Sequence, residues 1–158
     1  MKSFKVNKYI TLSLKDGKTE IYVNNELFLL CKKLVIQLDE FNFEEFEDIE
    51  SIDELVKRGS FPNNKLIDIP PEIEFWGHCS NIQAWADNNY NPSLIHSNLA
   101  FPLLKKLTDE GDSKARIIFK EEILKRLEQS NETVLITLLE NQYLDFLHGM
   151  IYNLYMII

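Results

Sequence analysis

The sequence predicts an α+β protein in which a small N-terminal antiparallel sheet packs on a C-terminal multi-helix region. Alternating apolar and polar residues on both sides of Asp16-Gly17 are typical of a β-hairpin, and from Pro70 onward apolar residues recur at helical spacing. The 158 residues, 45% of them hydrophobic and 27% charged, suit one globular domain. We expect a single domain over residues 1–158, divided into a β-rich part (1–60), a helical part (61–142) and an apolar tail (143–158).

The hairpin is the first predicted element. Residues 9–14 alternate as a half-buried strand does, Asp16-Gly17 supplies the positive φ angles of a tight turn, and residues 19–23 resume a β-favouring run. Asn24-Asn25 indicates a second turn. We expect residues 26–31 to form a short helical turn and residues 34–38 to form a third strand, because a lone hairpin is only marginally stable.

An acidic stretch over residues 39–50 follows, in which three phenylalanines alternate with Asp and Glu. It is either a partner-binding segment or an aromatic cluster tucked under the domain, and the second interpretation is favoured. Ser51 and Glu54 have the spacing of a capping box, which predicts a short helix over residues 52–58. The loop at residues 61–64 is the clearest internal boundary.

Helices are predicted for the remainder. Pro70-Pro71 favours a helix start, and the face that follows is apolar through residue 86. Ser93 is expected to cap a short helix, and Pro102 to open another that ends at Gly111. Residues 113–129 form the strongest amphipathic pattern, and Asn131 is expected to cap a last helix ending near residue 141. Short connections favour antiparallel neighbours.

Charge and cysteine content narrow the function. Lys and Arg total 17 against 25 Asp and Glu, a net charge of −8, which argues against broad nucleic-acid binding. A local basic patch is compatible with the sequence at Lys105, Lys106, Lys114 and Arg116. The two cysteines form no CxxC pair, and no signal peptide or membrane span is apparent, so we expect a cytoplasmic protein. The apolar tail is interpreted as a core segment or, alternatively, a homodimer contact.

Catalytic residue types gather in residues 72–98. The sharpest enzymatic hypothesis pairs Cys79 as nucleophile with His96 as base and Asp87 as orienting group; His78 is a further candidate. However, the apolar stripe places Cys79 inside, where a thiol is inert, and adjacent His78 points about 100° away on a helix. A buried structural cysteine is therefore favoured. No metal-ligand or phosphate-loop spacing occurs, so we expect neither a metal nor a cofactor.

A binding function is the preferred alternative. Both tryptophans lie in this stretch, with amide and aromatic side chains around them, a composition that suits recognition of a protein partner. A core role for the tryptophans is the competing interpretation. The candidate binding residues are Trp76, His78, Asn81, Trp85, Asn89, Tyr90 and His96.

Several segments also carry a family resemblance. They are PEIEFWGHCSN at residues 71–81, WADNNY at residues 85–90 and LIHSNLAFPLLKKL at residues 94–107, together with the hairpin and FKEEI at residues 119–123, and they resemble a module that precedes leucine-rich repeats in archaeal proteins. The resemblance implies a cap or adaptor and offers no catalytic residues to transfer. Where repeats are expected to begin, this chain has the apolar tail. The sequence thus predicts a non-enzymatic protein-interaction module; the alternative is a cysteine- and histidine-dependent hydrolase or transferase.

Overall fold

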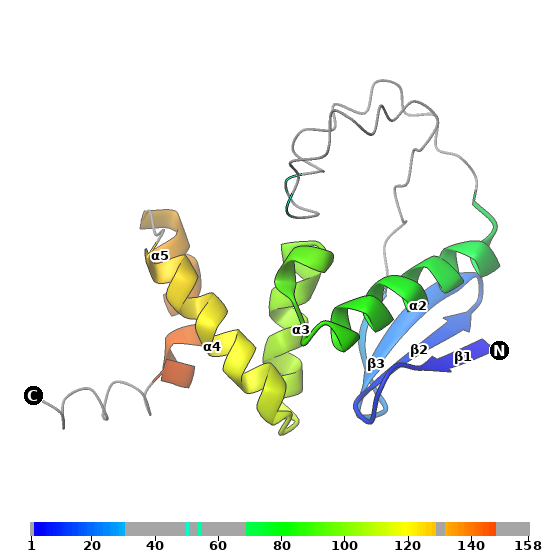
Figure 1. The fold of residues 1–158 in the computed structure, drawn as a ribbon, viewed down its shortest axis with the longest axis horizontal. Coiled ribbons are helices and arrows are strands. Elements are labelled where there is room, and N and C mark those ends of the chain that lie inside the picture. The colour runs from blue at the N-terminus through cyan, green and yellow to red at the C-terminus, as the bar shows by residue number, and fades with distance from the viewer. Residues whose placement is uncertain (1, 31–49, 51–53, 55–68, 129–131, 148–158) are drawn as a thin grey trace, which may run out of the picture.

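A computed structural model describes residues 2–30, 50, 54, 69–128 and 132–147, which form an antiparallel sheet and a set of helices, so the chain is α+β (Figure 1). The sheet has four strands in the order β1-β2-β3-β4. The strands are β1 (Lys2–Lys5), β2 (Ile10–Lys15), β3 (Lys18–Val23) and β4 (Glu26–Leu30). The helices are α2 (Pro71–Asp87), η2 (Pro92–Leu94), α3 (Ser97–Asp109), α4 (Ser113–Glu128), α5 (Glu132–Glu140) and η3 (Tyr143–Leu147).

The central hairpin confirms the turn prediction. Lys15 pairs with Lys18, so the loop consists of Asp16 at φ 49° and Gly17 at φ 73°. Two successive positive φ angles give a turn whose twist matches that of the flanking strands. The hairpin buries Ile10 and Leu12 on one strand and Ile21 and Val23 on the other, all without exposed surface.

Both outer strands correct the sequence prediction. The expected helical turn at residues 26–31 is wrong, because Glu26–Leu30 is strand β4. Asn24 at φ 53° and Asn25 at φ 68° form a second two-residue turn, which returns the chain beside β3 with Glu26 opposite Val23. Strand β1 was not predicted at all. The predicted strand at 34–38 and the loop at 61–64 lie outside the described residues. So do the acidic stretch at 39–50, apart from Glu50, and the capping box with its helix at 52–58, apart from Glu54.

Helix α2 lies across one face of the sheet and contacts β2 and β3 (Figure 1). Its start at Pro71 is confirmed, and of the face predicted for it Phe75, Cys79 and Ile82 are buried, whereas Ala86 is partly buried and Trp85 is fully buried. Proline is compatible with this first helical position because the amide hydrogen it lacks has no helical partner there. The remaining helices continue away from the sheet.

Helix α3 begins and continues differently from the prediction. Its N-cap is His96, whose Nδ1 accepts a hydrogen bond from the Asn98 backbone N–H at 3.1 Å. Asn91, not Ser93, caps the preceding turn η2 by accepting from the Ser93 N–H at 3.0 Å. Pro102 lies inside α3 instead of opening a new helix. Burial of apolar residues on both sides of Pro102 outweighs the helix-breaking preference of proline.

Helix α3 ends at a glycine, as predicted. Gly111 has φ 89°, its N–H donates to Thr108 O at 3.1 Å, and the Asp112 N–H donates to Leu107 O at 2.9 Å. This pair of bonds is a Schellman motif. Asp112 then accepts from the N–H groups of Lys114 and Ala115, which caps α4. Helices α3 and α4 are consequently antiparallel neighbours, with the rings of Phe101 and Phe119 5.0 Å apart.

The C-terminal elements pack on α4. The predicted apolar stripe of α4 is confirmed, with Ala115, Phe119 and Ile123 fully buried. Helix α5 matches the predicted last helix; its expected cap Asn131 lies outside the described residues. Within the apolar tail, η3 packs Leu147 into the core, whereas residues 148–158 are not described. No helix among the described residues is long and apolar enough to cross a membrane.

Candidate functional site

The two tryptophans of α2 lie in opposite environments. Trp85 has no exposed surface and packs on the Tyr90 ring at 4.7 Å, whereas Trp76 is 51% exposed. Nine residues separate them, which is two and a half helical turns, so they point to opposite sides of the helix. The two indoles therefore do not line one groove. Trp85 belongs to the core, and only Trp76 is available to a partner.

The other predicted binding residues are dispersed. Asn81 and Asn89 are exposed, and Asn89 has a left-handed backbone with φ 58° after the end of α2. Tyr90 is 4% exposed, and its hydroxyl donates to Asp112 Oδ2 at 2.6 Å. His96 uses Nδ1 to cap α3. The structure thus gives Tyr90 and His96 structural contacts, and a binding role for these residues stays a prediction.

The Cys79 and His78 environment does not favour nucleophilic chemistry. Cys79 is 2% exposed, and burial raises the pKa of its thiol to about 11. A reactive cysteine needs the opposite shift, toward thiolate at neutral pH. Burial lowers the pKa of His78, and Glu74, 4.0 Å from Nε2, opposes this only in part. The described residues also hold no group of three or more potential metal ligands.

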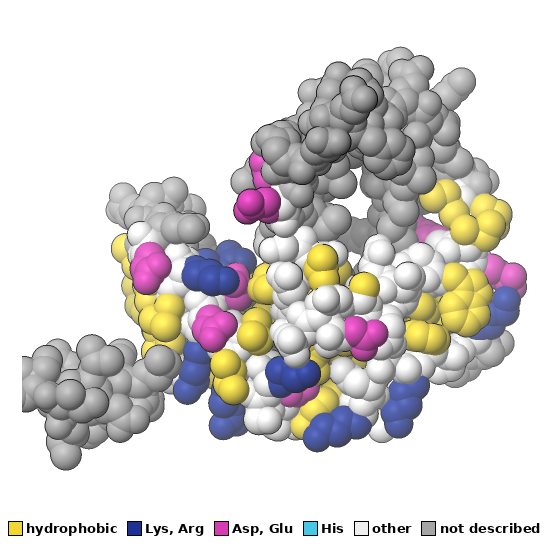
Figure 2. All heavy atoms as spheres, in the orientation of Figure 1, with side chains coloured by type: hydrophobic (Ala, Val, Ile, Leu, Met, Phe, Trp, Pro, Cys, Tyr) yellow, Lys and Arg dark blue, Asp and Glu magenta, His cyan; other side chains and the backbone are white. Residues whose placement is uncertain are grey.

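A more promising surface lies where α2 meets strand β1. Ile73 is 63% exposed, Trp76 is 51% exposed, and half-buried Phe4 lies beneath the indole with the two ring centroids 6.0 Å apart in an edge-to-face arrangement. Figure 2 shows hydrophobic side chains at the N-terminal end of α2. We call Phe4, Ile73, Trp76 and the outer edge of β1 the β1–α2 surface. An ion pair between Lys2 and Glu72 at 2.9 Å joins its two elements.

The N-terminal segment that contains β1 carries positive charge in an otherwise acidic chain. The first 15 residues contain four lysines, at positions 2, 5, 8 and 15, and no Asp or Glu, although the whole chain has a net charge of −8. Lys5 is exposed on β1, and Lys8 lies in the turn that follows. Charges grouped in this way favour approach of an acidic partner.

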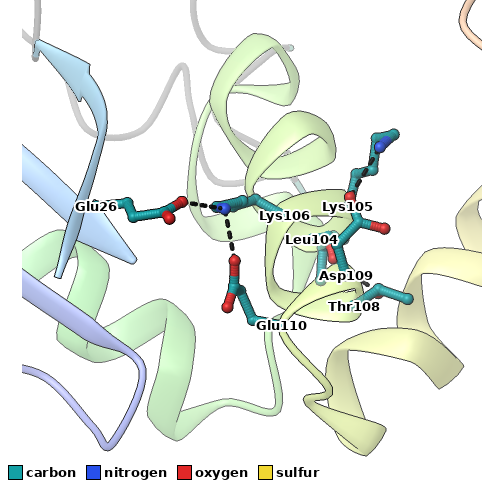
Figure 3. Close-up of polar contacts among 7 residues, drawn as sticks. All are labelled: Glu26, Leu104, Lys105, Lys106, Thr108, Asp109 and Glu110. Carbon is teal, nitrogen blue, oxygen red and sulfur yellow. Dashed lines mark hydrogen bonds and ion pairs between the residues drawn. The ribbon is translucent and has the colours of Figure 1, made fainter. Parts of the chain in front are cut away.

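The predicted basic patch is largely neutralised. Figure 3 shows Lys106 Nζ between Glu26 Oε2 at 2.8 Å and Glu110 Oε1 at 2.5 Å, which ties β4 to α3. Lys105 pairs with Asp109 at 2.8 Å, and Lys114 lies over the Tyr90 ring at 5.9 Å. Of these four basic side chains, that of Arg116 alone makes no hydrogen bond, ion pair or cation–π contact within the described part of the chain.

Comparisons with protein-family models, curated proteins and solved structures find no match to this chain. The resemblance to a module associated with leucine-rich repeats therefore stays a prediction. The β1–α2 surface itself was missed by sequence reasoning, apart from Trp76. One available indication was that Ile73 interrupts the polar side of α2; another was that Phe4 and Val6 alternate with polar residues as strand residues do.

Proposed function

We propose that this chain is a non-enzymatic protein-interaction module that binds an extended acidic segment of a partner along strand β1. The observation that carries the proposal is the half-exposed Trp76 packed on Phe4 of an edge strand. β1 is first in the strand order, so one side of its backbone has no neighbouring strand among the described residues. A partner strand added there satisfies these N–H and C=O groups, which is a common mode of peptide recognition.

The side chains supply the selectivity of this proposed contact. Trp is enriched among the residues that dominate interface energies, and Ile73 extends the apolar area by one helical turn. A partner strand would place alternate apolar side chains against Trp76 and Ile73. Its acidic residues, which alternate with the apolar ones, would lie on the opposite face and meet Lys5, because Lys2 shares the face of Phe4 and is paired with Glu72. This charge pattern raises the association rate and disfavours basic partners.

The adaptor role includes the cap implied by the leucine-rich-repeat resemblance. In that case the partner strand would belong to the first repeat of an array, whose apolar end needs cover. The hydrolase or transferase alternative has less support, because the thiol it depends on is buried and its pKa is raised.

The proposal is tested with defined peptides and the full chain. The acidic probe is a peptide in which Glu residues alternate with the apolar residues Val, Phe and Val. One control peptide has Lys in place of each Glu and tests the charge preference. A second control has Pro at its centre, which disrupts pairing as a strand. We expect the acidic peptide alone to bind and to slow hydrogen exchange of β1 amides, since added main-chain hydrogen bonds protect them. Protection of no β1 amide by the acidic peptide, or equal binding of the Lys peptide, would overturn the proposal.

Variants locate the contact. W76A should weaken binding of the acidic peptide by roughly tenfold or more, as expected for a dominant interface residue. K5E should weaken it mainly at low salt. The matched control is I117A, which removes another exposed apolar residue, 60% exposed on α4, and should leave affinity unchanged. Circular dichroism confirms that each variant folds. A folded W76A that binds as wild type contradicts the assigned surface.

A further inference from the structure

A second surface lies at the other end of the molecule, between α3, α4 and η3. It is a solvent-open pocket of about 340 Å³ lined by Thr108, Asp109, Arg116, Lys120 and Phe146. This volume is at the lower end of the range for small-molecule sites. Figure 2 shows Lys and Arg side chains along the edge of the molecule formed by α4 and the end of α3.

The charges of this pocket are unbalanced. Asp109 is the acidic residue of the lining, and it is already paired with Lys105 at 2.8 Å. The side chains of Arg116 and Lys120, four residues apart on α4, have no hydrogen bond or ion pair in the described part of the chain. Like charges at this helical spacing repel each other. A bound anion would relieve this repulsion and form charge-assisted hydrogen bonds with both side chains.

Phe146 gives the pocket an apolar wall that is held in place. Its ring packs edge-on against Phe119 at 5.1 Å, and Phe119 has no exposed surface. Lys105 Nζ lies 5.5 Å from the centroid of the same ring. Thr108, 2% exposed, donates its hydroxyl hydrogen to Leu104 O at 2.8 Å (Figure 3). A wall packed in this way loses little side-chain entropy when a ligand ring stacks on it.

We propose that this pocket binds a small organic anion that carries a phosphate or carboxylate on an aromatic body. The oxyanion would contact Arg116, whose planar guanidinium suits such groups, and Lys120. The aromatic body would pack on Phe146. This site is separate from the β1–α2 surface, involves none of its residues, and does not depend on the proposed partner.

The test is a titration of the full chain at low salt, monitored by NMR of backbone amides and using four probes. They are phenyl phosphate, benzoate, inorganic phosphate and benzyl alcohol. We expect phenyl phosphate to shift amides around Arg116, Lys120 and Phe146 saturably, and to bind at least tenfold more tightly than inorganic phosphate or benzyl alcohol. Benzoate should bind the same site more weakly, because it carries less charge.

Variants separate the two halves of the site. R116Q and K120Q should each weaken phenyl phosphate binding by fivefold or more, and F146L should reduce its advantage over inorganic phosphate. K125Q is the matched control, because Lys125 also lies on α4 but does not line the pocket and is paired with Glu122 at 2.8 Å. The K125Q protein should bind phenyl phosphate with wild-type affinity. The proposal is overturned if phenyl phosphate shows no saturable binding up to about 10 mM, or if it binds no more tightly than inorganic phosphate. It is also overturned if folded R116Q and folded K120Q both bind phenyl phosphate with wild-type affinity, or if the amide shifts are centred away from Arg116, Lys120 and Phe146.

Discussion

Cys79 lies on the buried face of α2 and is 2% exposed, and burial raises the pKa of its thiol to about 11 from an ordinary 9.0. The thiolate is the form that reacts with iodoacetamide. A C31S variant, which leaves Cys79 as its one thiol, should therefore react at about pH 8 roughly 100-fold more slowly when folded than when unfolded in urea. Mass spectrometry measures the rates. Equal rates of modification in the folded and unfolded states would show that the thiol is accessible and reactive. That result would support the alternative of a cysteine-dependent enzyme.

The imidazole of His78 makes stability depend on pH. Burial lowers its pKa below the ordinary 6.5, with partial compensation by the Glu74 carboxylate. As the pH falls below about 6.5, the unfolded chain takes up a proton at this residue more readily than the folded chain does. The free energy of unfolding should therefore decrease as the pH falls from about 6.5 through the folded-state pKa of His78.

An H78Q variant isolates this contribution. Urea unfolding at about pH 7, 6 and 5 should show a smaller loss of stability in H78Q than in wild type, because glutamine does not titrate. Carboxylates elsewhere contribute equally to both proteins. If the two proteins lose the same free energy over this interval, protonation of His78 is not coupled to folding.

Among the secondary-structure elements, the junction of α3 and α4 depends most directly on one residue type. Gly111 has φ 89°, and a Cβ added there meets nothing within 4 Å. A substitution is therefore destabilising because of backbone strain and not because of steric crowding. G111A should destabilise the protein by about 1–2 kcal/mol, because the left-handed conformation is unfavourable for alanine. Chemical denaturation measures this loss.

G111N is the matched variant for the same position. Asparagine adopts the left-handed region more readily than alanine, so G111N should recover part of the stability lost in G111A. A G111A protein as stable as wild type, or a G111N protein less stable than G111A, would mean that the positive φ angle does not limit this turn.

At the scale of the whole molecule, a short hydrogen-bonded chain links the sheet to the helices. Asn7 Nδ2, in the turn after β1, donates to the Tyr90 hydroxyl at 3.1 Å, and that hydroxyl donates to Asp112 at the start of α4. Asn7 Oδ1 in turn accepts from the N–H groups of Tyr9 and Ile10. The ion pairs of Lys106 with Glu26 and Glu110 form a second link.

Removal of the Tyr90 hydroxyl should weaken the first link. Y90F should cost roughly 1–3 kcal/mol, because it leaves a buried carboxylate oxygen of Asp112 without its donor. Y143F is the control, since Tyr143 packs its ring on Phe101 without a hydroxyl hydrogen bond in the described part of the chain. Urea unfolding is followed by tryptophan fluorescence, which reports on α2, and by circular dichroism, which reports on all helices.

In wild type the two signals should change together, as they do in a cooperative domain. In Y90F the midpoints of the fluorescence and circular dichroism transitions should separate, because the hydrogen-bonded link between the sheet and the helices is weakened. A Y90F protein with wild-type stability would contradict a structural role for this hydroxyl. Separation of the signals already in wild type would contradict the single cooperative domain expected from the sequence.

Features that depend on neighbouring residues could be predicted from the amino-acid sequence alone. Asp16-Gly17 specified the central hairpin, the apolar periodicity of α2 and α4 specified their buried faces, and Gly111 specified the end of α3. In each case the deciding interaction spans a few residues: a turn conformation, a cap or a helical face. The burial of Cys79 followed from the same local geometry.

Features that depend on residues distant in the sequence became apparent only from the three-dimensional packing. Residues 26–30 form a strand because β3 lies beside them, and Pro102 stays within α3 because residues around it are buried. Trp76 meets Phe4, 72 positions away in the chain, and Phe146 meets the α3–α4 helix pair beside Arg116 and Lys120. Both proposed binding surfaces arise from contacts between residues far apart in sequence, which local periodicity and turn chemistry do not encode.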